Sequence, residues 1–396
     1  MGVKLDAARW WSQMGMRELL TALGASERLT RFVGGTVRDE LLGIPHADVD
    51  LATRLDPQSV VERLESARIK AVPTGIEHGT ITAVSRGQVA EITTLRRDVS
   101  TDGRRATVAF TEDWEEDAAR RDFTINALSA DPVSGEIFDY FGGLEDLEKR
   151  HIRFIGDPLE RIAEDHLRIL RFFRFHARFG SGEPDQPALD ACTARANDLM
   201  ALSRERIADE LLKLLAVSDP SVTVGTMLER GILRPVLPEI EPERLGDLRA
   251  LIVAERQADI APDPLRRLSA LLPRDPLTAE EVAVRLRLSN KARSRLASSA
   301  ASELFSSPQA LAYRIRTESA VDRLLLAGEI EAARAIASWK PPRLPIKGGE
   351  LIARGLAEGP VVARTLRRIE DEWVRAGFPT GEPFDEIVSR ALRSAS

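Results

Sequence analysis

Two aspartates separated by one residue, Asp48 and Asp50, stand in the stretch HADVDLAT. In an extended strand, residues two apart face the same side, so the two carboxylates would lie a few ångströms apart. Like charges at that distance repel unless a cation lies between them. Oxygen ligands of this kind suit Mg²⁺, which binds one or two carboxylates together with substrate phosphates, as in metal-assisted nucleotidyl transfer. Taken alone, the pair is more typical of a solvated strand end.

A glycine pair, Gly34-Gly35, precedes the aspartates and follows the apolar stretch TRFV. A glycine backbone can approach a phosphate closely, and the helix start expected after it offers free N–H groups. Arg38 follows three residues later, within reach of the same phosphates. The glycine pair, the arginine and the aspartate pair together predict a triphosphate site far more specifically than any one of them.

The stretch ARRDFTINAL contains a second charged group, Arg120, Arg121 and Asp122. Adjacent arginines facing a phosphate site would stabilise the charge of a triphosphate. The aspartate would orient an arginine or hold a ribose. A surface ion-pair cluster is the alternative, because the surrounding DWEEDAARRD carries both signs of charge.

A single helix is predicted over residues 159–177, with a core stripe that includes Leu159, Ile162 and Phe173. On its surface Asp165 and Arg168 would be neighbours at positions i and i+3. An acceptor and a donor held side by side can meet the Watson–Crick edge of a base. Taken alone, the pair is better explained as a helix-surface salt bridge.

Four stretches together carry a family resemblance: GGTVRDELLGIPHADVDLAT (34–53), ARRDFTINAL (119–128), EDHLRILRFFRF (164–175) and, more weakly, LSRERIADELLKLL (202–215). As a set they resemble the class II tRNA nucleotidyltransferases (CCA-adding enzymes) and bacterial poly(A) polymerases. This family belongs to the polymerase β-like nucleotidyltransferase superfamily. The resemblance covers roughly residues 28–215, and a softer match extends over 344–366.

The resemblance implies a role for each matching residue. Asp48 and Asp50 would hold Mg²⁺, and Glu91 would be the third catalytic carboxylate. Asp165 and Arg168 would read the incoming base as a protein template, and Arg171 and Arg174 would lie along the triphosphate or the base stack. The nucleotide-binding set is then Gly34, Gly35, Arg38, Arg121, Asp122, Asp165, Arg168, Arg171 and Arg174.

The activity implied is template-independent addition of CCA to the 3′ end of tRNA from CTP and ATP. Poly(A) polymerase and A-adding activity share the same motifs and remain alternatives. A non-catalytic RNA-binding module is a further alternative; it predicts loss of a carboxylate, yet Asp48, Asp50 and Glu91 are all present.

The expected fold class is α+β, because strand and helix signals mix up to about residue 150 and helical patterns dominate afterwards. A hairpin is predicted around Arg86-Gly87, a helix and two strands over residues 120–140, and a loop over residues 98–110 in which Arg104 and Arg105 would touch substrate or solvent. The expected domains are a nucleotidyltransferase head (1–150), a helical neck for base recognition (151–215), and a helical body and tail for tRNA binding (216–396).

The composition of the 396-residue chain limits the classes of protein to which it can belong. A net charge of −6 counts weakly against a non-specific nucleic-acid binder, whose surface is usually basic. The only cysteine, Cys192, excludes an internal disulfide. The N-terminus lacks signal-peptide features and no apolar run is long enough to span a membrane, so a cytoplasmic protein is expected.

Overall fold

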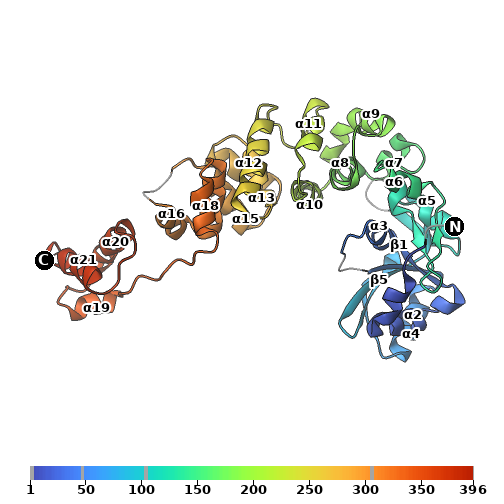
Figure 1. The fold of residues 1–396 in the computed structure, drawn as a ribbon, viewed down its shortest axis with the longest axis horizontal. Helices are drawn as coiled ribbons and strands as arrows, with labels where there is room; N and C mark the ends of the chain where they lie inside the picture. The colour runs from blue at the N-terminus through green and yellow to red at the C-terminus, as the bar shows by residue number, and fades with distance from the viewer. Residues whose placement is uncertain (1–3, 46–48, 102–105, 304–306, 396) are drawn as a thin grey trace. The chain divides into compact units, whose positions relative to one another are not determined.

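The computed structural model describes residues 4–45, 49–101, 106–303 and 307–395. The chain divides into two compact units, residues 1–210 with 230–236 and residues 211–229 with 237–396. The expected α+β class is confirmed, because the strands belong to the first unit and helices form the rest of the described chain (Figure 1). The predicted boundary at residue 150 falls inside the first unit, and the division into head, neck and body stays a prediction.

Within the described part of the first unit, seven strands form one sheet in the order β3-β4-β5-β2-β1-β8-β9. Neighbouring strands are antiparallel except β2 and β5, which are parallel. The predicted hairpin around Arg86-Gly87 is confirmed as β4 and β5. The strands are β1 (Thr30–Val33), β2 (Val49–Thr53), β3 (Lys70–Gly75), β4 (Thr80–Ser85), β5 (Gln88–Thr94), β8 (Ser129–Ala130) and β9 (Ile137–Phe138).

One face of this sheet is covered by helices α2 (Met14–Ala22) and α4 (Pro57–Ser66), which pack together and against β4. The strand residues on that face are apolar and fully buried, as in the cross-strand pair of Ile81 and Ile92. Side chains alternate along a strand, so Glu91 points to the opposite face, where it is exposed. This opposite face is therefore open around Glu91, whereas Ala52 on the same face is buried in a cluster with Trp114.

Residues 98–110 were predicted to form a loop, and this prediction is wrong for the described parts. They form most of a separate two-stranded antiparallel sheet of β6 (Arg96–Thr101) and β7 (Ala106–Phe110). The β-branched and aromatic residues of the stretch favour strands despite its polar composition. Arg104 and Arg105 lie outside the described residues.

The helix expected within residues 120–128 is also absent from the described structure. Helix α5 (Trp114–Ala119) ends before it, and a single 3-10 turn (Thr124–Asn126) follows. The Asp122 carboxylate accepts hydrogen bonds from the backbone of Phe123 and the side chain of Asn126, and such local bonds compete with a regular helix. The two strands and the turn predicted after it are confirmed as β8 and β9.

The single helix predicted over residues 159–177 is two helices, α7 (Pro158–Glu164) and α8 (Arg168–Phe179). The break changes which side of α7 is buried: Ile162 is fully buried as expected, but Leu159 is 48% exposed. The remaining helices that belong wholly to the first unit are α1 (Ala7–Ser12), α3 (Gly35–Leu41), α6 (Gly143–Glu148) and α9 (Gln186–Ala194).

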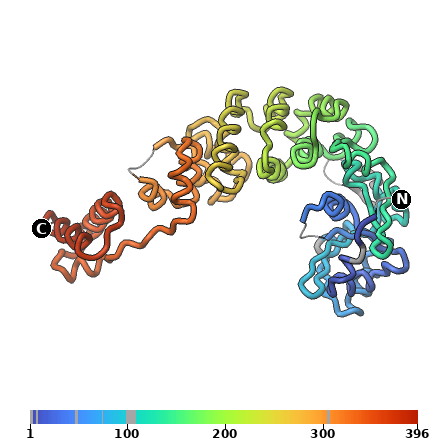
Figure 2. Tube along the Cα trace, in the orientation of Figure 1, coloured from blue at the N-terminus to red at the C-terminus, as the bar shows by residue number. Residues whose placement is uncertain are grey.

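The boundary between the units falls within α10 (Arg204–Leu215). The described part of the second unit is a succession of helices, traced from yellow-green to red in Figure 2. They are α11 (Ser221–Glu229), α12 (Arg244–Ala258), α13 (Pro264–Leu271), α14 (Pro276–Arg285), α15 (Asn290–Ala300), α16 (Pro308–Ile315), α17 (Thr317–Leu326), α18 (Ile330–Ile336), α19 (Gly348–Ala353), α20 (Pro360–Arg375) and α21 (Glu382–Arg393). None of the helices that the structure describes is long and apolar enough to cross a membrane.

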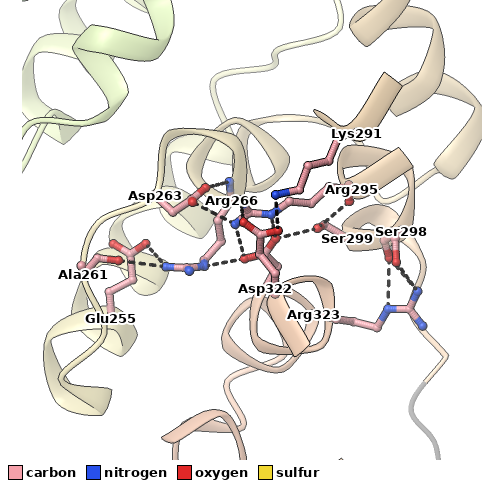
Figure 3. Close-up of polar contacts among 11 residues, drawn as sticks. Glu255, Ala261, Asp263, Arg266, Lys291, Arg295, Ser298, Ser299, Asp322 and Arg323 are labelled. Atoms are coloured by element: carbon pink, nitrogen blue, oxygen red, sulfur yellow. Dashed lines mark hydrogen bonds and ion pairs between the residues drawn. The ribbon is translucent and has the colours of Figure 1, made fainter. Parts of the chain in front are cut away.

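A buried cluster of ion pairs connects four of these helices (Figure 3). Asp322 of α17 is fully buried and receives hydrogen bonds from Arg266 of α13 and Arg295 of α15. Arg266 also pairs with Glu255 of α12 at 2.7 Å. The ion pairs fix these helices relative to one another, since breaking any pair would leave a buried charge without its partner.

Candidate active site

The glycine turn after β1 is built as the sequence predicts. Gly34 has φ 60° and ψ −121°, a conformation that residues with a Cβ rarely adopt, and α3 begins at Gly35. A Cβ on Gly34 would come within 2.8 Å of a terminal nitrogen of Arg121. The backbone conformation therefore requires glycine here, whereas a Cβ would only displace the tip of the Arg121 side chain.

Asp50 and Glu91 are paired in register on the parallel strands β2 and β5. The backbone N–H of Asp50 donates to the Thr36 hydroxyl at 2.8 Å, which fastens β2 to the start of α3. The Asp50 carboxylate lies near Gly35, whose Cβ, if it had one, would be 3.5 Å from Oδ2. Asp48 lies outside the described residues, so its position stays a prediction.

Arg38 is buried, and its guanidinium is held from several sides. It donates to Asp39 Oδ1 at 2.8 Å and to the side-chain oxygen of Asn126, and it stacks 4.2 Å over the ring of Phe179. Burial lowers the pKa of Arg38, although the charge of Asp39 acts against it. The arginine is therefore a fixed, largely desolvated part of the wall rather than a mobile surface charge.

The Asp122 carboxylate is bonded from several sides. Its Oδ1 accepts from Asn126 Nδ2 at 2.9 Å, and its Oδ2 accepts from Arg171 Nε at 2.7 Å and lies 2.5 Å from Nη2. Burial raises the pKa of Asp122, but the charge and hydrogen bonds of Arg171 and the Asn126 amide outweigh it, and the pKa lies below its usual value. Of the two roles predicted for Asp122, this geometry supports orienting an arginine.

The break between α7 and α8 changes the geometry expected for Asp165 and Arg168. Asp165 is extended, and its side chain accepts from the backbone of Leu167 at 3.1 Å, which helps start α8. Asp165 also pairs with Arg206 of α10 at 2.8 Å. Arg168 donates to Glu164 and to the backbone carbonyl of Arg120 instead. The single continuous helix from which the i, i+3 geometry was inferred is therefore wrong, and each side chain is held by other groups.

Arg171 and Arg174 lie along α8 and share the carboxylate of Glu210. Arg174 Nε donates to Glu210 Oε2 at 2.5 Å, and Arg171 Nη1 lies 3.7 Å from Oε1. Burial lowers the pKa of Arg171, but Asp122 and Glu210 reverse this, so the pKa lies above its usual value. Both arginines are positively charged, and the Glu210 carboxylate holds both side chains in place.

These side chains line one cavity of about 460 Å³ in the first unit. Every candidate site residue that the structure describes lines it except Glu91, which stands beside Asp50 in the sheet. Six arginines and three aspartates face the cavity, so its walls attract anions although the whole chain is acidic. The lining residues are Gly34, Gly35, Arg38, Asp50, Arg120, Arg121, Asp122, Asn126, Asp165, Arg168, Arg171, Arg174 and Phe175.

Two of these lining residues, Asn126 and Phe175, were given no site role from the sequence, and Arg120 was named only as part of the arginine pair. Asn126 is four residues after Asp122, a spacing that brings side chains together in any helical turn, and this could have indicated it. Two residues behind the wall, Glu210 and Asp117, were missed as well. Glu210 binds Arg174 from α10, a distant contact that no local pattern indicates. Asp117 of α5 binds Arg121 at the spacing i, i+4, which the charge pattern of the stretch could have indicated.

The donor set around Asp50 fits a hard divalent cation. Asp50 and Glu91 supply carboxylate oxygens from paired positions on the sheet face opposite to α2 and α4, and Asp48 is two residues from Asp50 in the sequence. Such oxygens are the ligands that Mg²⁺ prefers. The described residues alone contain no group of three or more potential metal ligands.

Two sequence profiles match the chain. One, described as "Poly A polymerase head domain", matches residues 30–153, and one described as "Probable RNA and SrmB- binding site of polymerase A" matches residues 183–244. The mitochondrial CCA tRNA nucleotidyltransferase 1 of Mus musculus is 32% identical over 393 residues, which cover 95% of this chain and 89% of the relative. The chain belongs to the CCA tRNA nucleotidyltransferase family.

Bacterial members of the family show the same similarity. The CCA-adding enzyme of Lacticaseibacillus paracasei is 32% identical over 365 residues, which cover 88% of each chain. The crystal structure of the Bacillus stearothermophilus CCA-adding enzyme in complex with CTP is similar with a TM-score of 0.73 and 25% identity, over 96% of this chain and 99% of the other. The Thermotoga maritima CCA-adding enzyme complexed with tRNA shares the fold, with a TM-score of 0.68 at 20% identity.

Proposed function

We propose that this protein completes the 3′ end of tRNA by adding CMP, CMP and AMP from CTP and ATP without a nucleic-acid template. The observation that carries this proposal is the similarity to CCA-adding relatives over nearly the whole chain. Poly(A) polymerases have the same kind of head, so the arginine-lined cavity alone does not decide between the two activities.

The nucleotide triphosphate occupies the arginine-lined cavity. The backbone of Gly34 and Gly35 approaches the phosphates, and Arg121, Arg171 and Arg174 face them with fixed guanidinium groups. Asp122 and Glu210 hold two of these arginines in place before the nucleotide binds, so little reorganisation is needed as charge develops.

The reaction joins the tRNA 3′ oxygen to the α-phosphorus and releases pyrophosphate. Asp50, with Asp48 and Glu91, faces the attacking hydroxyl, and a carboxylate of this group takes its proton. CCA-adding enzymes need a divalent metal, and we propose Mg²⁺, held by Asp48 and Asp50. When bound, it would lower the pKa of the attacking hydroxyl and offset the charge of the phosphates.

The incoming base is read by Asp165 and Arg168, which supply an acceptor and donors at the same cavity. Arg206 forms an ion pair with Asp165, and the Arg120 carbonyl accepts a hydrogen bond from Arg168. Because the two are held by separate groups, each can be repositioned without the other when C is exchanged for A.

The helices that follow the head hold the tRNA through phosphate contacts, which position the substrate without reading its sequence. The profile match over residues 183–244 supports RNA binding in this region. A cytoplasmic location stays a prediction from the sequence, and several relatives are named as mitochondrial enzymes.

The product formed on tRNA that lacks its terminus tests the proposal. The protein is incubated with radiolabelled CTP and ATP, and the product lengths are resolved on a gel. Addition of three nucleotides that then stops supports CCA completion. Long A tracts would identify a poly(A) polymerase, and extension only of tRNA already ending in CC would identify an A-adding enzyme. If no tRNA were extended, the protein would be a non-catalytic RNA-binding protein.

A further inference from the structure

A single buried carboxylate, that of Asp117 in α5, binds three groups at once. The residue is 3% exposed. Its Oδ1 accepts from Arg120 Nε at 2.9 Å and from the backbone N–H of Arg96 at 3.2 Å, and its Oδ2 accepts from Arg121 Nη2 at 3.2 Å. Asp117 itself does not line the cavity.

Two of these three partners belong to the cavity wall. Arg120 and Arg121 both line it, and the backbone carbonyl of Arg120 accepts from Arg168 Nη2 at 3.1 Å. Asp117 therefore holds Arg121, which is proposed to face the triphosphate. It also holds Arg120, whose carbonyl accepts a hydrogen bond from Arg168, the arginine proposed to read the base.

The third partner, Arg96, is the first residue of β6 and so one end of the β6–β7 hairpin. The other end also rests on α5: the hydroxyl of Thr111, directly after β7, donates to Glu116 Oε2 at 2.6 Å. The backbone N–H of Thr111 donates to the Leu95 carbonyl and closes the hairpin base. Adjacent acidic residues of one short helix thus hold the two ends of the hairpin, and Asp117 is the one that also binds cavity arginines.

The charges at this junction depend on each other. Burial raises the pKa of Asp117, but Arg121 and Arg120 outweigh it and the pKa lies below its usual value. Burial lowers the pKa of Arg120 to about 10, against the attraction of Asp117. If the carboxylate lost its charge, two neighbouring guanidinium groups would face each other without a counter-charge, and their positions would change.

We propose that Asp117 is a positioning residue that couples the base of the β6–β7 hairpin to the arginines of the nucleotide cavity. This inference rests on the proposed function, because it assumes that Arg121 binds the triphosphate. A nucleotide that draws Arg121 toward its phosphates changes the bonds of Asp117, and Asp117 passes the change to the first residue of β6.

Two isosteric variants of the full-length protein separate this role from a structural one. Asp117→Asn keeps the shape but removes the charge that holds the arginines, whereas Glu116→Gln alters the hairpin base alone. The KM for CTP and for ATP is expected to rise about tenfold in Asp117→Asn, since charge-assisted bonds position the arginine, and to stay within about twofold of wild type in Glu116→Gln. Asp117→Glu keeps the charge and displaces the oxygens by one methylene; it is expected to raise KM in the same direction, and it replaces Asp117→Asn if that variant does not fold.

Hydrogen exchange with and without saturating CTP tests the coupling directly. In the wild type and in Glu116→Gln, CTP is expected to slow exchange of the β6 and β7 amides; in Asp117→Asn this protection is lost although CTP still binds. An unchanged KM in Asp117→Asn, the same KM change in Glu116→Gln, or protection that survives in Asp117→Asn would overturn the proposal. If the wild type extends no tRNA, the proposed function fails, but protection of the hairpin by CTP still decides the role of Asp117.

Discussion

Asp50 and Glu91 occupy directly paired positions on the parallel strands β2 and β5. They lie on the sheet face that α2 and α4 leave open, and Glu91 is exposed there. Two carboxylates held side by side by a backbone ladder repel each other at neutral pH. A divalent cation would remove that repulsion, and this supports the proposal that the pair belongs to the catalytic centre rather than to a stabilising contact.

Replacing Asp50 by asparagine should abolish most nucleotide addition without unfolding the head. The amide keeps the size of the side chain but removes one negative charge from the proposed metal site. Loss of several kcal/mol of charge stabilisation corresponds to a decrease in kcat of about 10³-fold. Single-turnover addition of CMP measures the rate, and the matched control is Glu65→Gln on the exposed surface of α4. Activity within tenfold of wild type in Asp50→Asn would remove this aspartate from the mechanism.

Replacing Asp165 by alanine should weaken discrimination between bases more than catalysis itself. A site that hydrogen-bonds the correct base rejects analogues that leave its polar groups unpaired. The ratio of kcat/KM for CTP to that for UTP is expected to fall by about 10–100-fold. Glu160→Ala, an exposed residue of α7, is the control. If CTP and UTP lost activity equally, Asp165 would be a structural residue held by Arg206 rather than a base reader.

Much of the site could be predicted because its short motifs also form the local structure. Gly34 was predicted because a glycine backbone before a helix start can approach a phosphate closely, and Asp50 from the same-face spacing of two aspartates along a strand; both line the cavity. The Arg86-Gly87 turn signal between two β-rich runs likewise predicted β4 and β5.

The errors occurred where a side chain competes with the backbone pattern. The helical periodicity across residues 159–177 is real, but Asp165 bonds to the following backbone and divides the segment. The contacts of Glu210 were not predictable either, since its partners Arg171 and Arg174 lie on another helix, up to 39 residues away. Asp117 pairs with Arg120 and Arg121 at the local spacings i, i+3 and i, i+4, and only its bond from the Arg96 backbone N–H comes from another element. Hydrophobic periodicity predicts which face of a helix is buried. It does not predict which distant charged side chain contacts that helix.

Removing the charge of Asp322 should destabilise the second unit strongly. Asp322 is fully buried between Arg266 and Arg295, so Asp322→Asn leaves two buried arginines short of a counter-charge, at a cost of about 3–5 kcal/mol. Glu318→Gln, whose side chain is 48% exposed, should cost less than about 1 kcal/mol. Urea unfolding of both variants gives the comparison. CTP affinity should be unchanged because the cavity belongs to the first unit; equal stability of the two variants would contradict the prediction.

The stability contributed by Asp122 should depend on pH in the acidic range. Its pKa in the folded protein lies below its usual value, against an unfolded value of about 3.9. The ionised carboxylate therefore stabilises the fold fully above the unfolded pKa, and this stabilisation is lost as the pH falls through the folded pKa. Asp122→Asn should lower Tm clearly at pH 7, and the difference from wild type should shrink below about pH 4. Glu148→Gln, at an exposed position, is the control; a pH-independent difference would show that the charge of Asp122 does not matter.

Replacing Arg68 by glycine should stabilise the first unit. Helix α4 ends with the Ile69 N–H bonded to the Leu64 carbonyl at 2.8 Å and the Arg68 N–H bonded to the Glu65 carbonyl at 2.9 Å, which places Arg68 at the left-handed position with φ 58°. A side chain there costs about 1 kcal/mol, which glycine avoids. Tm should rise by about 2–4 °C for a unit of this size.

The same substitution within the helix should have the opposite sign. Glu62→Gly lies inside α4, where glycine costs about 1 kcal/mol relative to a good helix former. Differential scanning calorimetry of both variants and wild type measures the two shifts. Both positions are exposed and change to the same residue, so the main difference between them is the backbone conformation; Glu62→Gly also loses the exposed hydrogen bond from Gln58 Nε2 at 3.0 Å. Destabilisation by both variants would mean that contacts of the Arg68 side chain outweigh the strain of its backbone.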